Sequence, residues 1–321
     1  MRNLYPMKLK PAYKDYLWGG TKLKDEYGKT TQLHIVAESW EVSCHPDGLS
    51  VVINGIYAGV SLWDVLSSNP DFIGTMCNEK SQFPILIKFI DAASDLSLQV
   101  HPDDDYAVRC ENGQQGKNEM WYIVECEPGA KLILGLKKQL TKQRMRLAIE
   151  NDTILDYIRA VPVKPGDCYC LPAGTLHAIG KGILIAEVQQ NSNLTYRVYD
   201  YGRLDTSGNP RKLHIDKAID VTDAYKKPLK SDFEKQISAD YNMEKLSNWD
   251  YFDARKYTLH TAMEMIADRK SFHTYICLSG EVIVNSRAES IMLNKGESIY
   301  IPAGLGKYTI KGNADLLFTA L

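Results

Sequence analysis

Short runs of β-branched and aromatic residues, separated by Gly, Pro and Asn, dominate the chain. Such runs predict β-strands, and the clearest are "LSVVINGIYAGVSL", "FPILIKFIDA", "MWYIVECEPGAKLILG", "DCYCLPAG", "GILIAEVQQ", "HTYICLSGEVIVN" and "ESIYIPAG". Helical periodicity is confined to a few segments, and we expect helices mainly within residues 60–75, 103–110, 137–160 and 213–225. Thr141 suits the N-cap of the third of these helices. The pattern therefore predicts a mainly β protein.

An internal repeat refines this prediction. "PGDCYCLPAGTLHAIGKG" (165–182) aligns with "KGESIYIPAGLGKYTIKG" (295–312), and the strands ahead of the two copies align more loosely. Hairpins of this kind are typical of a jelly roll, and the pattern resembles the cupin superfamily. We expect two cupin-type jelly-roll barrels with a small helical insertion. Residues 1–240 would form a catalytic, metal-binding domain and residues 241–321 a degenerate C-terminal domain.

One predicted strand ends in polar residues of an unusual kind. In "LSLQVHPDDDYA", Gln99 and His101 are two positions apart, so an extended backbone places them on the same face. Leu98 and Val100 then share the opposite face. The acidic run after Pro102 is explained by a helix N-cap and a solvated first turn.

The repeat singles out one copy for chemistry, because His177 of the first copy is replaced by Lys307 in the second. His101, Glu119 and His177 offer two imidazoles and a carboxylate, which zinc accepts, and Gln99 could add a neutral oxygen. A lone histidine on a strand is more often a hydrogen-bonded core residue. Here a jelly roll would bring both histidines and Glu119 together, which favours a metal site.

Three cationic side chains lie where apolar residues would be expected or beside the proposed ligands. Lys88 interrupts "ILIKFI", and Lys117 is two positions before Glu119. Arg197 lies between Tyr196 and Val198 in "EVQQNSNLTYRVYDYGR", a segment rich in hydrogen-bonding groups. An exposed arginine stacked on tyrosine is the alternative for Arg197.

Composition excludes several classes of protein. The 321 residues are 44% hydrophobic and 24% charged with a net charge of -2, so there is no basic excess for binding nucleic acid. No apolar stretch is long enough for a membrane span, and the N-terminus lacks a secretory signal. The seven cysteines include no CxxC pair, which favours reduced thiols and a cytoplasmic location. Cys168 and Cys170 fit small core residues better than metal ligands.

Several ordered motifs resemble one family. "LSLQVHPDD", "GKNEMWYIVE", "LPAGTLHAIG" and "VQQNSNLTYRVYDYGR" are similar to motifs of type I mannose-6-phosphate isomerases of the compact bacterial form, as are "AYKDYLWGGTKL" and "AESWEVSCHPDG". The resemblance implies one zinc ion per chain, bound by Gln99, His101, Glu119 and His177. It also implies a catalytic Arg197. Lys88, Ser97 and Lys117 match positions that line the sugar-phosphate pocket.

The expected reaction is the interconversion of mannose 6-phosphate and fructose 6-phosphate through an enediol. A divalent cation would stabilise the developing charge, and a positioned base would move the proton. Lys117, Glu187 and a metal-bound water are all candidates for that base; we assign Lys117 to catalysis and Glu187 to substrate binding. The partner would be a small sugar phosphate, and the chain would be a monomer or weak homodimer. The alternatives are another metal cupin enzyme, such as a non-haem iron dioxygenase or a different sugar-phosphate isomerase, and a non-catalytic sugar-binding cupin.

Overall fold

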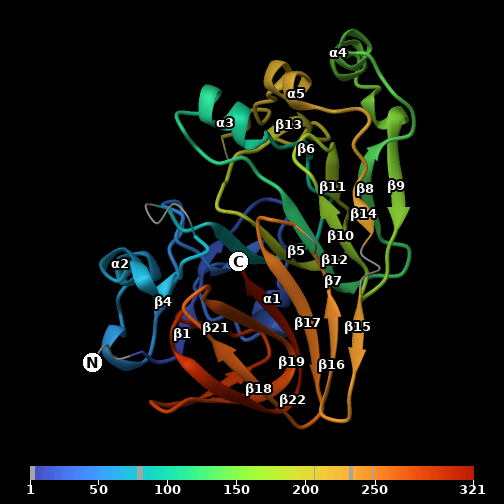
Figure 1. Ribbon diagram of the computed structural model, residues 1–321. Helices are drawn as coiled ribbons and strands as arrows, with labels where there is room; N and C mark the ends of the chain where they lie inside the picture. Colours follow the sequence, from blue (N-terminus) through green and yellow to red (C-terminus); the bar gives the residue numbers. More distant parts are fainter. Residues whose placement is uncertain (1–3, 78–81, 206, 231–233, 248) are drawn as a thin grey trace. The chain divides into compact units, whose positions relative to one another are not determined.

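The computed structural model describes residues 4–77, 82–205, 207–230, 234–247 and 249–321 (Figure 1). The chain divides into two compact units. The first contains Met1–Lys14, Thr21–Phe89 and Asp232–Leu321, and the second contains Asp15–Gly20 and Ile90–Ser231. Strand β5 (Ile85–Ala92) runs from one unit into the other.

The first unit is built largely from the two ends of the chain. Its N-terminal elements are β1 (Met7–Lys10), β2 (Ala12–Lys14), α1 (Lys22–Asp25), β3 (Glu38–Val42), β4 (Val51–Val52), η1 (Gly55–Tyr57), α2 (Leu62–Ser68) and η2 (Pro70–Phe72). Its C-terminal elements are β15 (Lys235–Ile237), β16 (Tyr241–Lys245), β17 (Asp253–Leu259), β18 (Ala262–Ala267), β19 (His273–Asn285), β20 (Ser290–Asn294), β21 (Ser298–Ile301) and β22 (Gly306–Ala320).

A ten-stranded sheet joins these two ends. Its order is β15-β16-β17-β22-β19-β21-β1-β4, with β18 added to β22 and β20 added to β19. Alternate residues of the long strands β19 and β22 point inward and form an apolar core that includes Tyr275, Leu316 and Phe318. Because β1 pairs with β21, the N-terminal residues pack with the C-terminal part of the chain. The assignment of 1–240 and 241–321 to a catalytic and a degenerate domain stays a prediction.

The second unit contains the remaining elements. They are β6 (Leu98–Val100), α3 (Asp104–Cys110), β7 (Glu119–Cys126), β8 (Lys131–Leu136), α4 (Lys142–Glu150), η3 (Ile154–Tyr157), β9 (Ile158–Pro162), β10 (Cys168–Leu171), β11 (His177–Ile179), β12 (Ile183–Gln190), β13 (Tyr196–Tyr199), α5 (Ile215–Val221) and β14 (Leu229–Lys230). One antiparallel sheet has the order β13-β6-β11-β8-β9, and β14-β10-β7-β12 run side by side in another.

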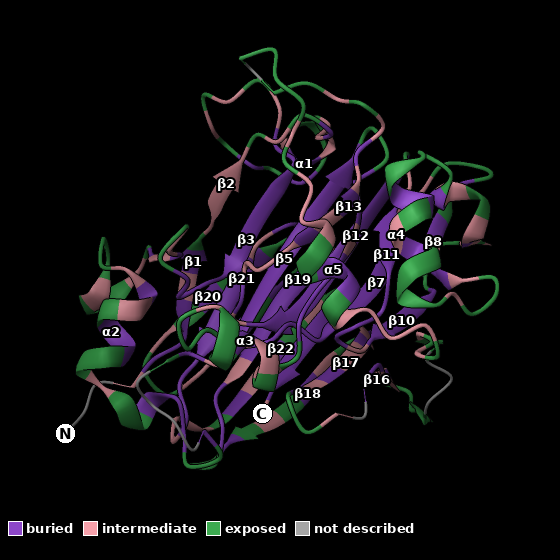
Figure 2. Ribbon diagram, turned by 90° about the horizontal axis from the view of Figure 1, so that it is seen from above, coloured by how far each residue is buried: buried purple, intermediate pink, exposed green. Residues whose placement is uncertain are grey.

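Helices α4 and α5 cover one face of the five-stranded sheet. Leu98 and Val100 of β6 pack there with Met145, Ile149 and Ala218 of the two helices. Figure 2 shows the consequence, since the strands are buried while each helix keeps an exposed outer face. The opposite face of β6 therefore remains for Gln99 and the polar residues that follow.

The predicted mainly β fold is confirmed, and its sheets are antiparallel. The expected helical segments contain α2, α3, α4 and α5, and Thr141 caps α4 by accepting a hydrogen bond from the Arg144 backbone. Two closed barrels are compatible with these sheets and stay a prediction. The two Pro-Ala-Gly turns of the repeat share one backbone conformation, with φ of 85° at Gly174 and 83° at Gly304. Only glycine adopts this left-handed region without strain.

Candidate metal centre

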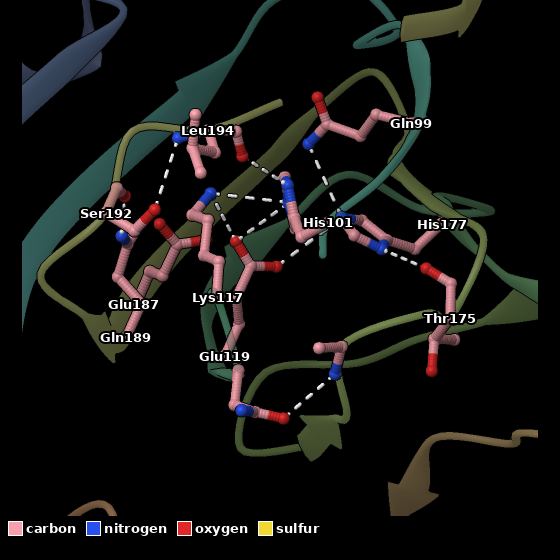
Figure 3. A network of polar contacts seen from close by, with 12 residues as sticks. Gln99, His101, Lys117, Glu119, Thr175, His177, Glu187, Gln189, Ser192 and Leu194 are labelled. Atoms are coloured by element: carbon pink, nitrogen blue, oxygen red, sulfur yellow. Dashed lines mark hydrogen bonds and ion pairs between the residues drawn. The ribbon is translucent and has the colours of Figure 1, made fainter. Parts of the chain in front are cut away.

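Three side chains of the second unit converge in its interior (Figure 3). His101 directly follows β6, Glu119 is the first residue of β7, and His177 is the first residue of β11. All three are buried, and one ligand atom from each lies within 4.8 Å of the others. The predicted grouping of two imidazoles and one carboxylate is therefore present.

The Glu119 carboxylate lies between the two imidazoles. Its Oε1 is 3.2 Å from His101 Nε2, and its Oε2 is 3.4 Å from His177 Nε2. Each histidine turns the same ring nitrogen toward the carboxylate. Nitrogen and carboxylate oxygen are donors that divalent transition metals accept, so this set fits a metal ion.

Backbone carbonyls orient both rings. Nδ1 of His101 is 2.7 Å from the Leu194 carbonyl oxygen, and Nδ1 of His177 is 2.8 Å from the Thr175 carbonyl oxygen. A carbonyl only accepts, so each Nδ1 must carry the proton and donate it. The Nε2 lone pairs then face the carboxylate and are available to a metal, which is how a surrounding carbonyl usually prepares a histidine ligand.

Burial keeps the imidazoles neutral. Desolvation, followed by the positive charge of Lys117, lowers the pKa of His101 to about 3. Desolvation also lowers the pKa of His177. Burial alone would raise the pKa of Glu119, but the positive charge of Lys117 holds it well below its usual range. At neutral pH all three groups are therefore in the protonation state that binds a metal.

Lys117 belongs to the same cluster. Its Nζ lies 2.5 Å from Glu119 Oε1 and 3.3 Å from His101 Nε2, and its side chain is buried. Lys117 and Glu119, two positions apart in the sequence, thus point into the same cluster. A proton carried on this Nζ would lie within the metal centre.

Gln99 has the predicted position but not the predicted orientation. Its amide nitrogen, rather than its oxygen, faces His177 Nε2 at 3.4 Å. The amide contacts an acceptor in this structure, so it donates. Ligation by the oxygen of Gln99 would require the amide to turn over, and it stays a prediction.

Arg197 lies in the same row of the sheet as two of these residues. It is directly opposite Gln99, which in turn is directly opposite His177. Side chains at opposed positions of antiparallel strands share a face. Arg197 Nη1 donates to the Lys212 carbonyl oxygen at 3.0 Å, and its buried Nε has no acceptor among the residues described. Burial, followed by the charge of Arg211, lowers the pKa of Arg197.

The facing strands β7 and β12 carry a second row of polar groups. Trp121 is opposite Glu187 and donates from Nε1 to its Oε2 at 2.7 Å. The Trp121 ring also packs edge-on against His177, with 5.2 Å between ring centroids. Glu187 is thus buried on the face that carries Glu119.

Gln189 is a residue that the sequence interpretation missed. It lies opposite Glu119 and is completely buried. The available signal was its spacing, because Gln189 is two positions after Glu187 on an extended strand. The carbonyls of Leu194 and Thr175 carried no such signal, since any residue has a backbone carbonyl.

The two remaining predicted substrate-binding residues, Ser97 and Lys88, lie in different units of the chain. Ser97 is buried just before β6, in the unit that contains His101, Glu119 and His177. Lys88 lies in the first unit, with Nζ 3.5 Å from Glu38 Oε2 and 5.1 Å from the centroid of the Trp40 ring. Its contribution to substrate binding stays a prediction.

Fold and site together define a class of protein: a mainly antiparallel β protein with a buried triad of two histidines and one glutamate that could hold a metal ion. The comparisons with known proteins make this specific. The family model "Phosphomannose isomerase type I, catalytic domain" matches residues 7–123, and "Mannose-6-phosphate isomerase, cupin domain" matches residues 242–320. The chain belongs to the type I phosphomannose isomerase family.

Full-length relatives agree with this assignment. The chain is 37% identical to mannose-6-phosphate isomerase ManA of Bacillus subtilis, over 98% of this chain and 99% of that protein. It is 33% identical to the mannose-6-phosphate isomerase of Streptococcus mutans, over 97% of each. The crystal structure of mannose 6-phosphate isomerase from Bacillus subtilis superposes with a TM-score of 0.90 at 34% identity, covering 98% of this chain and 99% of that one.

Proposed function

We propose that this protein is a metal-dependent aldose–ketose isomerase that interconverts mannose 6-phosphate and fructose 6-phosphate. The observation that carries the proposal is the buried triad of His101, Glu119 and His177, whose Nε2 and carboxylate atoms face one another. It occurs in a chain whose relatives of that name align over almost their whole length.

We further propose that the metal is zinc and that one ion binds per chain, held by His101, Glu119 and His177, with Gln99 as a fourth ligand. A bound zinc ion supplies Lewis acidity for the negative charge that develops on the sugar oxygens during enolisation. The donor set supports this assignment, because neutral imidazole and carboxylate suit a borderline metal.

Interconversion requires that a proton leave C2 of the open-chain aldose and return to C1, through an enediol, while a hydroxyl proton moves from the oxygen on C2 to the oxygen on C1. Lys117 is our candidate for carrying this proton, since its Nζ lies within the metal centre. Arg197 lies in the row of Gln99 and His177, and its guanidinium would stabilise the charge of the enediolate. Ser97, Glu187 and Lys88 would bind the sugar phosphate, and Glu187 remains a second candidate for the base.

Two other functions are not favoured. Two histidines and a glutamate also suit non-haem iron, but the buried Lys117 and the half-buried Arg197 support an anionic substrate. A sugar-binding module would not need a buried triad with both rings oriented by carbonyls. In the described parts of the chain, every helix is too short or too polar to span a bilayer. A cytoplasmic location and a monomeric or weakly dimeric state stay predictions.

The test combines metal analysis with a coupled assay for fructose 6-phosphate. We expect about one zinc per chain, loss of activity after chelation and recovery when zinc is added back. The His177→Ala variant should lose both zinc and activity. His260→Ala, which removes an exposed imidazole, is the matched control and should keep both. Full activity without metal, or an isolated protein that carries iron and does not isomerise the sugar, would refute the proposal.

A further inference from the structure

The buried side chain of Gln189 has an amide nitrogen with two hydrogen-bond partners and an amide oxygen with none among the described residues. Its Nε2 donates to the Gln190 carbonyl oxygen at 2.9 Å and to the Ser192 carbonyl oxygen at 2.6 Å. Its Oε1 is buried and accepts no hydrogen bond from any residue that the structure describes. The side chain as a whole is 0% exposed.

The direction of this amide is determined by its surroundings. Turning it over would place the oxygen against two carbonyl oxygens and lose both donated hydrogen bonds. Gln189 is therefore anchored with Oε1 as an acceptor of defined position. An amide that served only to close the 190–192 loop would not need to bury an unused acceptor, since buried polar groups normally have partners.

The position of Gln189 connects this acceptor with the metal centre. Gln189 is opposite Glu119 on the neighbouring strand, and Glu187, on the same face, is opposite Trp121. Glu119 contacts both histidines and Trp121 packs on His177, so this face of β7 and β12 points toward the proposed metal. Figure 3 shows Gln189 beside Glu187, at the end of the cluster that contains Lys117.

We propose that Gln189 is a substrate-binding, specificity-determining residue whose Oε1 accepts a hydrogen bond from a hydroxyl group of the open-chain sugar. The inference rests on the proposed isomerase function. A hydroxyl on C3, C4 or C5 suits this role, because the oxygens on C1 and C2 take part in the reaction. Such a hydroxyl donates one hydrogen bond, which is what the anchored Oε1 lacks.

The experiment compares substrates that lack one hydroxyl in turn. The kcat/KM of mannose 6-phosphate is divided by that of its 3-deoxy, 4-deoxy and 5-deoxy analogues, for the wild-type protein and for Gln189→Met. Methionine has nearly the same length and volume but offers no amide. Any effect of a missing hydroxyl on ring opening is common to both proteins and cancels when the two ratios are compared.

We expect one analogue to be about tenfold or more poorer than the parent with the wild-type protein, since a site that binds a hydroxyl rejects the analogue without it. For Gln189→Met the same ratio of kcat/KM values should fall to about three or less, while the ratios for the other two analogues stay unchanged. A merely structural role would lower all the activities in parallel and leave every ratio unaltered.

Two further variants make the result decisive. Gln189→Asn keeps an amide, but its side chain is one methylene shorter and its oxygen is withdrawn from the substrate. This variant should lose the same discrimination, and it provides the test if Gln189→Met folds poorly. Gln143→Met makes the same substitution at an exposed position of α4 and should leave all kinetic values unchanged. Zinc content is measured for every variant, and it should be preserved.

The outcomes separate the two proposals. If the wild-type protein isomerises mannose 6-phosphate but all three ratios are the same in the Gln189 variants, the role of Gln189 is refuted and the isomerase function stands. If the wild-type protein does not isomerise mannose 6-phosphate, the proposed function fails, and the inference about Gln189 fails with it.

Discussion

Replacing Lys117 with methionine should destabilise the metal-free protein far more than the metal-loaded protein. In the metal-free state the Lys117 ammonium lies 2.5 Å from Glu119 Oε1, and both side chains are almost completely buried, with exposed fractions of 5% and 1%. Methionine retains most of the aliphatic stem and removes the charge. The Glu119 carboxylate is then left in the interior with two neutral imidazoles.

The expected cost follows from this burial. Removing one partner of a buried ion pair typically costs about 3–5 kcal/mol, because the remaining charge has no compensation. His101 can take up a proton once Lys117 no longer opposes it, so the cost should lie at the lower end of this range, at about 3 kcal/mol. A bound divalent cation neutralises Glu119 itself, so the metal-loaded variant should lose much less. By linkage, Lys117→Met should bind the metal about a hundredfold more tightly.

The assay is urea denaturation of the wild-type protein and the variant, with chelator and with zinc. Lys142→Met is the matched control, because it removes an exposed lysine 3.6 Å from Asp220 and should change stability by less than about 1 kcal/mol in both states. Equal destabilisation of Lys117→Met with and without metal would show that Glu119 and the metal do not interact. The same variant should lose most of its kcat if Lys117 carries the proton, whereas a raised KM with normal kcat would indicate substrate binding instead.

Three further predictions concern other residues. His177→Ala should abolish stoichiometric metal binding, whereas Lys307→Ala, at the equivalent position of the repeat, should leave it intact; full metal content in the His177 variant would contradict the site. Arg197→Ala should lower kcat and kcat/KM together by about two to four orders of magnitude at normal metal content. Arg197→Lys should recover little of this activity, because an ammonium lacks the planar guanidinium fork. A near-normal kcat of Arg197→Ala would show that Arg197 only packs against its neighbours. Burial lowers the pKa of His273 from 6.5 to about 4, so the unfolded state takes up a proton first as the pH falls, and stability should decrease between about pH 6.5 and pH 4. The contribution of His273 to the loss from pH 7 to pH 5 is about 2 kcal/mol. His101 and His177 contribute to both proteins, so urea denaturation should show a loss that is smaller by this amount in His273→Gln than in the wild-type protein, and an equal slope in both would refute the assignment.

Local pattern was sufficient for much of the fold. The alternation in "LSLQVHPDD" correctly separated Leu98 and Val100, which pack under the helices, from Gln99, which faces the site. Strand periodicity depends only on the backbone geometry of the strand itself, so it can be recognised without knowing the neighbours. Thr141 and Asp103 were likewise recognisable as N-caps, because the capping hydrogen bond closes within a few residues.

The triad was also predictable in kind. His177 was selected because the repeat keeps a histidine in one copy and a lysine in the other, which is a comparison internal to the sequence. His101 and Glu119 were selected as metal-ligand residue types that a jelly roll would bring beside it. Their resemblance to known motifs gave the same residues. What the sequence could not supply was their common point in space, which depends on the pairing of β11 with β6 and on the facing strand β7.

The tertiary structure alone decided the details on which chemistry depends. The carbonyls of Leu194 and Thr175 orient the imidazoles, the amide of Gln99 turns its nitrogen toward His177, and Gln189 presents a buried oxygen. The pairing of β1 with β21 likewise joins the two ends of the chain in one unit. These features arise between residues far apart in the sequence. A residue type specifies which hydrogen bonds a side chain can make, but only the packed neighbours determine which of them are made.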